Sequence, residues 1–282
     1  MPTAIVTDST ACLPAYRVQQ SRVTVVPVQV TVDDVTFDEG VDISSLAISS
    51  ALTLGKEVTT NKPSPERFAE VYSALAHQGY DNVVSIHLSS ELSGTYSSAV
   101  LAARESIIPV QVVDSRTIAM GLGFAVLAAA EAEIAGASLS DIVEVATRRG
   151  RGARAFLYVD SIEHLRRGGR IGDAQAFVGA ALSIKPLLEV SGGRLVPRDK
   201  VRTASRAHAR LVELAVQSAL ELGGSVEVAV HHVGARDKAD QVSVSLGKAL
   251  PGVPVLIADL GAVLAAHAGP GALAVVVSPV LS

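Results

Sequence analysis

The chain has 282 residues, enough for one large domain or two of ordinary size. Hydrophobic residues make up 49% of it and charged residues only 18%, so it can bury an extensive core and still line an apolar binding site. The net charge of −4 and the aromatic content of 4% argue against nucleic-acid binding, which uses basic faces and stacking rings.

The termini and the most apolar segment suggest no membrane insertion. The first residues lack the basic and long apolar regions of a signal peptide. The most apolar segment begins at residue 120, and Glu131 and Glu133 interrupt it before it reaches bilayer length. Cys12 is the single cysteine, so no intrachain disulfide can form, which suits a reducing compartment. We expect a soluble, cytoplasmic protein without a transmembrane segment.

The first segments predict a buried strand and an irregular one. Residues 4–6 are apolar and end at Asp8, which we expect to make turn or cap hydrogen bonds. Residues 23–32 are rich in β-branched side chains but contain Pro27, so we expect an edge strand or a bulge. In the acidic cluster that follows, residues 38–40 predict a hairpin turn with solvated charges, because the spacing does not fit a calcium loop.

Strands and helices alternate through the rest of the first half. Ser64 and Pro65 are a typical helix start, and this helix should run to about residue 78. Apolar periodicity then predicts strands at residues 83–86 and 107–113 and helices at 95–106, 123–135 and 140–149. The alternation predicts a mostly parallel sheet with helices on both faces.

A charged, glycine-rich segment at residues 148–152 predicts a domain boundary, which gives domains 1–152 and 153–282. The second half then restarts with a strand at 154–159. Its later pattern predicts a β-hairpin at 185–197, helices after Thr203 and at 237–250, and strands at 226–230, 253–257 and 273–277.

The junction at residues 87–96 is the best candidate binding site. It joins a buried strand to a helix through serines, a glycine and a threonine. The free N–H groups and the dipole of a helix N-terminus attract anions, and Gly94 lets a ligand approach the backbone. Thr60, Asn61 and Lys62 precede another helix and form either an ordinary polar loop or a second wall of this site.

Arginines and a histidine of the second half are further candidates. Residues 165–172 contain three arginines and three glycines, which suits either a solvated turn or a contact with phosphate or an acidic partner. His231 and His232 point to opposite faces of a strand, so we expect no metal site there. His267, before Gly-Pro-Gly, is placed to face a cavity, although a lone histidine is more often structural.

A serine hydrolase is the alternative function. Ser93 would be the nucleophile, with His87 or His267 as the base. The interpretation is weak because Glu91 stands where a nucleophile elbow has glycine. The chain also lacks a phosphate-binding P-loop, so we expect any ATP to bind to another chain.

Eight segments, taken together and in order, resemble the DegV family. They are VTDST (6–10), TNKPSP (60–65), LSSELSGTY (88–96), VDS (113–115), GGRI (168–171), KP (185–186), RT (202–203) and HAGPGA (267–272). The resemblance covers essentially the whole chain. It implies two α/β domains, the first with a three-layer, mostly parallel sheet and the second with a mixed sheet and helices.

The resemblance also implies a function. Family members bind a long-chain fatty acid between or beneath the domains. Some are the acyl-carrying subunits of bacterial fatty acid kinase, in which a separate subunit phosphorylates the bound carboxylate with ATP and the acyl phosphate feeds phospholipid synthesis. The chain itself would then be a lipid-binding subunit, with no catalytic residue, metal or cofactor of its own.

The family's site residues map onto this sequence. The fatty-acid carboxylate would be bound by Thr60 and Ser93. Donors at the helix terminus would come from Gly94 and Thr95, and His267 would lie near the carboxylate.

Two arginines, Arg170 and Arg202, match residues expected to serve the kinase partner or the phosphate. The chain departs from the family pattern at Asn61, Lys62 and Glu91, which places a lysine and a glutamate near the pocket mouth.

Overall fold

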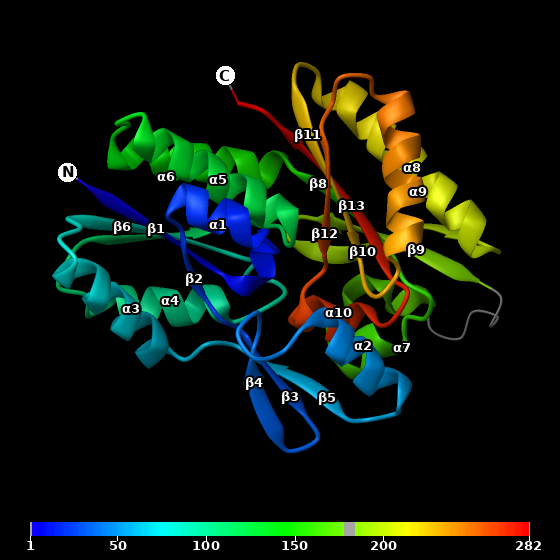
Figure 1. Ribbon diagram of the computed structural model, residues 1–282, viewed down its shortest axis with the longest axis horizontal. Coiled ribbons are helices and arrows are strands. Elements are labelled where there is room, and N and C mark those ends of the chain that lie inside the picture. The colour runs from blue at the N-terminus through cyan, green and yellow to red at the C-terminus, as the bar shows by residue number, and fades with distance from the viewer. Residues whose placement is uncertain (1, 178–183, 282) are drawn as a thin grey trace.

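The computed structural model describes residues 2–177 and 184–281, which form three sheets with helices around them (Figure 1). The two larger sheets come from the two halves of the chain. The third is small, and Figure 1 shows it below both of them.

The first sheet is parallel and lies between two layers of helices. Its strands run in the order β2 (Thr24–Val26), β1 (Thr3–Asp8), β6 (Asn82–His87) and β7 (Val110–Asp114). One face is covered by α3 (Pro65–His77) and α4 (Thr95–Arg104), and the other by α5 (Met120–Ile134) and α6 (Leu139–Gly152). Val6 packs with the first pair and Ile5 with the second, because side chains alternate along a strand. The predicted three-layer arrangement is confirmed.

The expected edge strand at residues 23–32 is confirmed for β2, which lies at the edge of the parallel sheet, but the segment is not one strand. The segment forms two strands in different sheets: β2 in the parallel sheet and β3 (Gln29–Val32) in the small antiparallel sheet, whose order is β4 (Val35–Asp38), β3 and β5 (Val58–Asn61). Pro27 lies between the two strands. It has no N–H to donate to a ladder, so the chain can leave one sheet there and enter another.

The prediction of a solvated hairpin turn at residues 38–40 is wrong. The turn between β3 and β4 is at Asp33 and Asp34, where Asp33 adopts a left-handed φ of 51° that aspartate tolerates. Glu39 follows β4 and is only 5% exposed. Its carboxylate accepts hydrogen bonds from Ser9 and from the backbone of Val263. Both partners are distant in sequence, so the local pattern could not reveal these contacts.

The second sheet is mixed, as predicted. Its order is β10 (Arg194–Val201), β9 (Lys185–Ser191), β8 (Arg154–Tyr158), β13 (Leu273–Pro279), β11 (Val226–His232) and β12 (Val255–Asp259), and only β11 and β12 pair in parallel. One face is covered by α8 (Ala204–Leu222) and α9 (Arg236–Ala249). The other face packs on the short helices α7 (Glu163–Arg167) and α10 (Ala262–Ala268).

Helix α5 explains the apolar segment that begins at residue 120. Leu122 and Val126 pack on the first sheet, while Met120 and Phe124 pack on the second. A helix buried on several sides needs no polar face. Within the described ranges, no helix has both the length and the hydropathy to cross a bilayer.

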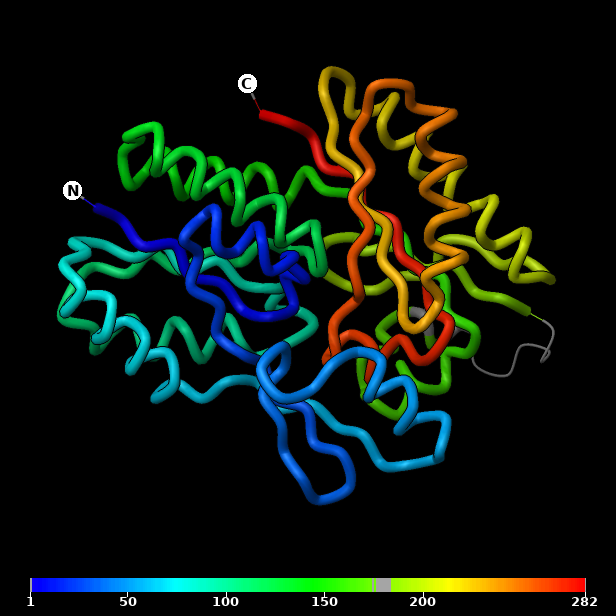
Figure 2. Tube along the Cα trace, in the orientation of Figure 1, coloured from blue at the N-terminus to red at the C-terminus, as the bar shows by residue number. Residues whose placement is uncertain are grey.

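The small sheet and the C-terminal segment lie side by side. Helix α2 (Ser45–Thr53), which follows β4, contacts α10, which is more than 200 residues away in sequence (Figure 2). Helix α10 also contacts β3 and β5. The small sheet therefore brings residues of the first half to α10.

Residues 148–152 form the last turn of α6, and the domain limits at 152 and 153 stay a prediction. Arg149 in this turn is only 4% exposed and pairs with Glu227 of β11. Its Nε donates to Ser278 Oγ at 2.9 Å. The arginine therefore joins the two halves of the chain.

We predict that Glu227→Gln lowers the free energy of unfolding by about 3 kcal/mol, because it leaves the buried Arg149 charge without its counterion. Urea denaturation measures the change. Glu144→Gln is the matched control, since Glu144 pairs with Arg148 on the exposed face of α6 and should change stability by less than about 0.5 kcal/mol. Equal effects of both variants would contradict the prediction.

Candidate functional site

A cavity with both polar and apolar lining residues lies where the first sheet, the small sheet and α10 meet. Its polar side chains come from the turn after β1 (Thr10), β5 and the residue after it (Thr60, Asn61, Lys62), the start of α4 (Ser93, Thr95), the segment after α7 (Arg170) and α10 (His267). Four of the five predicted carboxylate-binding residues, Thr60, Ser93, Thr95 and His267, thus line one cavity, although Thr60 and His267 are 207 residues apart in sequence. Gly94 is not among the lining residues.

One hydrogen bond defines the centre of the cavity. Thr60 Oγ1 lies 2.8 Å from His267 Nε2. Thr60 belongs to a strand and not to a loop as we predicted, because residues 58–61 complete the small sheet beside β3. The strand gives the hydroxyl a fixed position, and the short helix α10 gives the imidazole one.

The Ser93 junction forms the second wall. Ser93 Oγ lies 2.9 Å from Thr95 Oγ1 and accepts from Thr95 N at 3.3 Å. Gly94 is the N-cap residue of α4. A Cβ atom at this position would lie 2.8 Å from Lys62 Cδ, so glycine allows the lysine side chain to cross the helix terminus. The predicted strand–loop–helix junction is confirmed, and Lys62 adds a cation to it.

Arg170 closes the third side. Its Nε donates to Leu92 O at 3.2 Å and its Nη1 to Gly168 O at 2.8 Å. The guanidinium thus ties the α7 segment to the Ser93 junction. Burial, with a further contribution from the Arg170 charge, lowers the pKa of His267 to about 4. The imidazole is therefore neutral at pH 7 and can donate or accept a hydrogen bond.

A second, apolar cavity continues from the first. The two share Ile118, Leu165, Leu195, Leu264 and His267. The other described residues that line the second cavity are all Ala, Val, Leu or Phe. The combination is a polar mouth leading into an apolar passage, with His267 at the junction.

The passage is narrow in this conformation. The two cavities have volumes of about 60 and 50 Å³. Together they could hold about four water molecules. An elongated apolar molecule would have to displace the leucine and isoleucine side chains or move a wall.

A buried polar network supports the mouth. The Asp8 carboxylate lies 2.9 Å from His87 Nδ1 and accepts from the backbone of Leu88 and Thr10. His87 Nε2 in turn lies 2.8 Å from Ser85 Oγ. Asp8 therefore caps its own turn, as predicted, and also holds the end of β6, from which the Ser93 junction starts.

Three residues that the sequence analysis named, Arg202, His231 and His232, lie apart from the two cavities. Arg202 is exposed between β10 and α8, and it is not among the residues that line either cavity. His231 and His232 are both buried. Among the described residues, no group of three or more His, Cys, Asp or Glu is arranged to hold a metal ion.

The apolar lining and Glu39 could not be recognised from the sequence. Leu92, Leu195 and Leu264 come from three unconnected segments and carry no local motif. The arginine-glycine segment 165–172 was a candidate from its composition, the family pattern singled out Arg170 within it, and the contact of Arg170 with Leu92 could not be foreseen. Nothing in the local sequence distinguishes Glu39 from its solvated acidic neighbours.

Comparisons with known proteins identify the family of this chain. A family model described as "Uncharacterised protein, DegV family" matches residues 2–280. The chain belongs to the DegV family. A DegV domain-containing protein of Streptomyces coelicolor is 50% identical over 276 residues, with 98% of each chain covered.

Solved DegV structures share the whole fold. A fatty-acid-binding DegV family protein of Thermus thermophilus superposes with a TM-score of 0.92 at 33% identity, covering 99% of this chain and all of the other. DegV of Bacillus subtilis, described as a fatty acid binding protein, gives a TM-score of 0.89 at 33% identity, with 99% of each chain covered.

We predict that Gly168→Ala displaces the His267 ring. A Cβ atom on Gly168 would lie 2.1 Å from His267 Nδ1, and the backbone of the α7 terminus cannot yield easily. The Thr60–His267 hydrogen bond should be lost, which would appear as a changed imidazole resonance in NMR spectra.

Gly169→Ala is the control. Gly169 has a φ of +67°, and a Cβ atom added to it would meet no other atom within 4 Å, so alanine adds backbone strain without touching His267. An unchanged His267 resonance in Gly168→Ala, or the same change in both variants, would contradict the prediction.

Proposed function

We propose that this protein is a cytosolic long-chain fatty-acid-binding protein that presents the bound carboxylate to a separate kinase subunit. The observation that carries the binding proposal is the change from polar to apolar lining at His267. Such a passage suits a molecule with one polar end and a long apolar tail. Solved relatives described as fatty-acid-binding support the same ligand class.

The tail supplies most of the affinity. Burying one methylene group contributes roughly 0.8 kcal/mol, so a long chain gains far more than any single head-group contact. Among the described residues that line the second cavity, only His267 is polar. The contacts of the head group then determine which end of the ligand enters last and what it presents to a partner.

The head group needs hydrogen-bond donors. Burying a carboxylate without them is costly. The Thr60 and Ser93 hydroxyls, the neutral His267 ring and the N-terminal turn of α4 at Gly94 and Thr95 supply donors around the mouth. Lys62 and Arg170 add positive charge at its rim.

We predict that Ser93→Ala and Thr60→Val each weaken fatty-acid affinity by about tenfold. Each variant removes one hydroxyl that we propose contacts the carboxylate, and a hydrogen bond to a charged group contributes about 1.5–3 kcal/mol. Titration with fluorescent fatty acid measures affinity, and native mass spectrometry of the purified wild type should show copurified long-chain fatty acid.

Ser90→Ala is the matched control, because its hydroxyl bonds to Asp114 and does not line the cavities. The proposed function would be overturned if the wild-type protein carried no lipid and bound neither oleate nor palmitate. Equal affinity in Ser93→Ala and the wild type would remove Ser93 from the site.

The geometry does not favour the hydrolase alternative. Ser93 bonds to Thr95, whereas His267 bonds to Thr60 and His87 to Ser85 and Asp8. In the described part of the chain, no hydrogen bond joins Ser93 to a histidine. We therefore assign Ser93 as a hydrogen-bond donor to ligand rather than as a nucleophile.

The kinase step rests on the family resemblance and on charge. Arg202 is exposed and free of the cavities, which suits contact with a partner chain. Arg170 lines the mouth, where a guanidinium could stabilise an acyl phosphate. The proposed acyl phosphate would then leave for phospholipid synthesis.

We predict that the lipid-loaded protein forms acyl phosphate only when ATP and a bacterial extract are both present. Trapping the product as a hydroxamate measures it. Arg202→Ala should bind fatty acid normally but form much less hydroxamate, because the changed side chain lies outside the cavities. Hydroxamate formation by the pure protein with ATP alone would contradict the assignment to a partner.

A further inference from the structure

Glu39 is a buried carboxylate that connects three parts of the fold. Its Oε1 accepts from Val263 N at 2.7 Å, and its Oε2 accepts from Ser9 Oγ. Ser9 Oγ also accepts from Val28 N at 2.9 Å. One side chain thus joins the end of β1, the segment after β4 and the first turn of α10.

The contact with α10 is close. A Cβ atom on Gly261, the residue before this helix, would lie 2.6 Å from Glu39 Oε1. The first turn of the helix therefore sits directly on the carboxylate. At the other end of the same helix, His267 bonds to Thr60. Helix α10 is held to the first half of the chain at both ends.

Helix α10 is also a wall of the proposed binding site. Val263 lines the polar mouth, and Leu264 and His267 line both cavities. Because the passage is narrow, a fatty acid must displace part of its wall to enter or leave. If α10 is the part of the wall that moves, it must first break its contact with Glu39 at one end or with Thr60 at the other.

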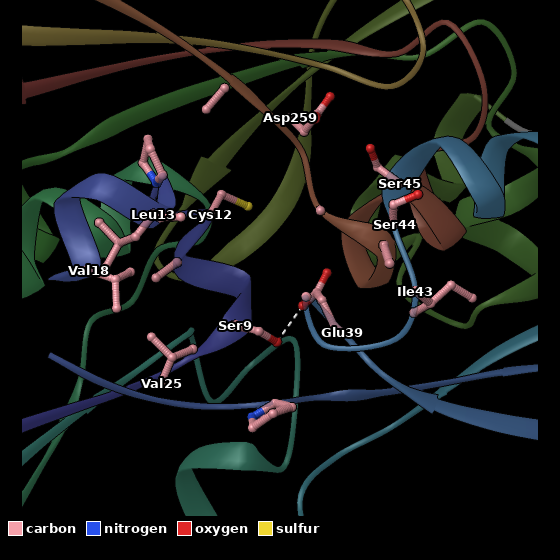
Figure 3. Close-up of a pocket in the computed structure, with 18 of the residues that line it drawn as sticks. Ser9, Cys12, Leu13, Val18, Val25, Glu39, Ile43, Ser44, Ser45 and Asp259 are labelled. Atoms are coloured by element: carbon pink, nitrogen blue, oxygen red, sulfur yellow. Dashed lines mark hydrogen bonds between the residues drawn. The ribbon is translucent and has the colours of Figure 1, made fainter.

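Glu39 also lines a wide cleft that has both polar and apolar side chains on its walls. Figure 3 shows Glu39 with Ser9, Cys12 and Asp259 at this cleft, and the Ser9–Glu39 hydrogen bond between them. The cleft volume is about 1130 Å³, which is large enough to admit water. A carboxylate released by α10 would therefore become hydrated on this side.

We propose that Glu39 is a positioning residue for the fatty-acid site: it clamps the first turn of α10, and its release lets this wall of the passage move so that ligand can exchange. This inference rests on the proposed function for its ligand. The clamp itself is a property of the fold and can be tested without ligand.

The surroundings of Glu39 make the clamp sensitive to protons. Burial, and less strongly the charge of Asp8, raise the pKa of Glu39 to about 7. The hydrogen bonds from Ser9 and α10 lower it, but by less than burial raises it. Cys12, whose pKa burial raises, and Asp259 lie at the cleft that Glu39 lines. Asp42, His232 and Arg236 line the same cleft.

The direction of the effect follows from linkage. We call the state in which Glu39 is bonded to α10 the closed form. In the closed form the pKa of Glu39 is about 7, whereas a hydrated Glu39 has about the ordinary pKa of 4.5. Protonation therefore favours the closed form, and its contribution is lost as the pH rises from 4.5 towards 7. Ligand exchange should become faster over this interval and level off above it.

Hydrogen–deuterium exchange tests the clamp in ligand-free protein. Glu39→Ala removes the acceptor for α10, so amides of residues 262–268 should exchange about tenfold faster than in the wild type. Glu39→Gln keeps an acceptor for Val263 and a donor for Ser9, so the amides of α10 should exchange no faster than in the wild type. Asp42→Asn, an exposed change in the same segment and cleft, is the control. Unchanged exchange in Glu39→Ala would overturn the clamp.

The release rate of a fluorescent fatty acid tests the link to the site. In the wild type it should be about tenfold faster at pH 8 than at pH 6. Glu39→Gln mimics the protonated form, so its release should stay slow at both values, while Asp42→Asn should behave like the wild type.

The outcomes separate the two proposals. If the wild type binds no fatty acid, the proposed function fails, and the exchange experiment still decides the clamp. If fatty acid binds but Glu39→Gln keeps the wild-type pH dependence, Glu39 does not control release and the inference is overturned.

Discussion

The hydrogen bond between Thr60 and His267 is the contact on which the site depends. It joins a strand of the small sheet to a helix near the C-terminus, 207 residues away. Because the two groups belong to different halves of the chain, the bond forms only when both sheets have folded and α10 has docked. The polar mouth and the apolar passage meet at this same histidine. The fold of the whole chain therefore decides whether a binding site exists at all.

In the proposed function, the site separates two physical tasks. The apolar passage can bind a tail through the hydrophobic effect, which is strong but has no direction. The mouth can orient a head group through hydrogen bonds, which are weaker in net terms but directional. His267 serves the mouth as a neutral group because burial and the Arg170 charge lower its pKa. A carboxylate held in this way would face outwards, where a partner could reach it.

The strands and helices of the sheet layers were largely predictable, since their apolar periodicity is local. The split at Pro27 was not, because a proline marks an interruption without saying which sheet receives the next strand. The Ser93 junction could be identified from hydroxyls and a glycine between a strand and a helix. The arginine-glycine segment around Arg170 was recognisable from composition, and the family pattern singled out Arg170 within it. Leu92, Leu195 and Leu264 had no signal, since an apolar residue looks the same in a core and in a passage.

The sequence by itself determined the fold class, the DegV family and the residue types that can hold an anionic head group, because these depend on local patterns and ordered motifs. Only the tertiary structure decided how they meet. It placed Thr60 on a strand, Arg202 away from the cavities and Glu39 inside the protein. The reason is physical: the surroundings of a side chain are set by segments distant in sequence, and the same carboxylate is solvated in a turn but clamps a helix when the chain folds over it.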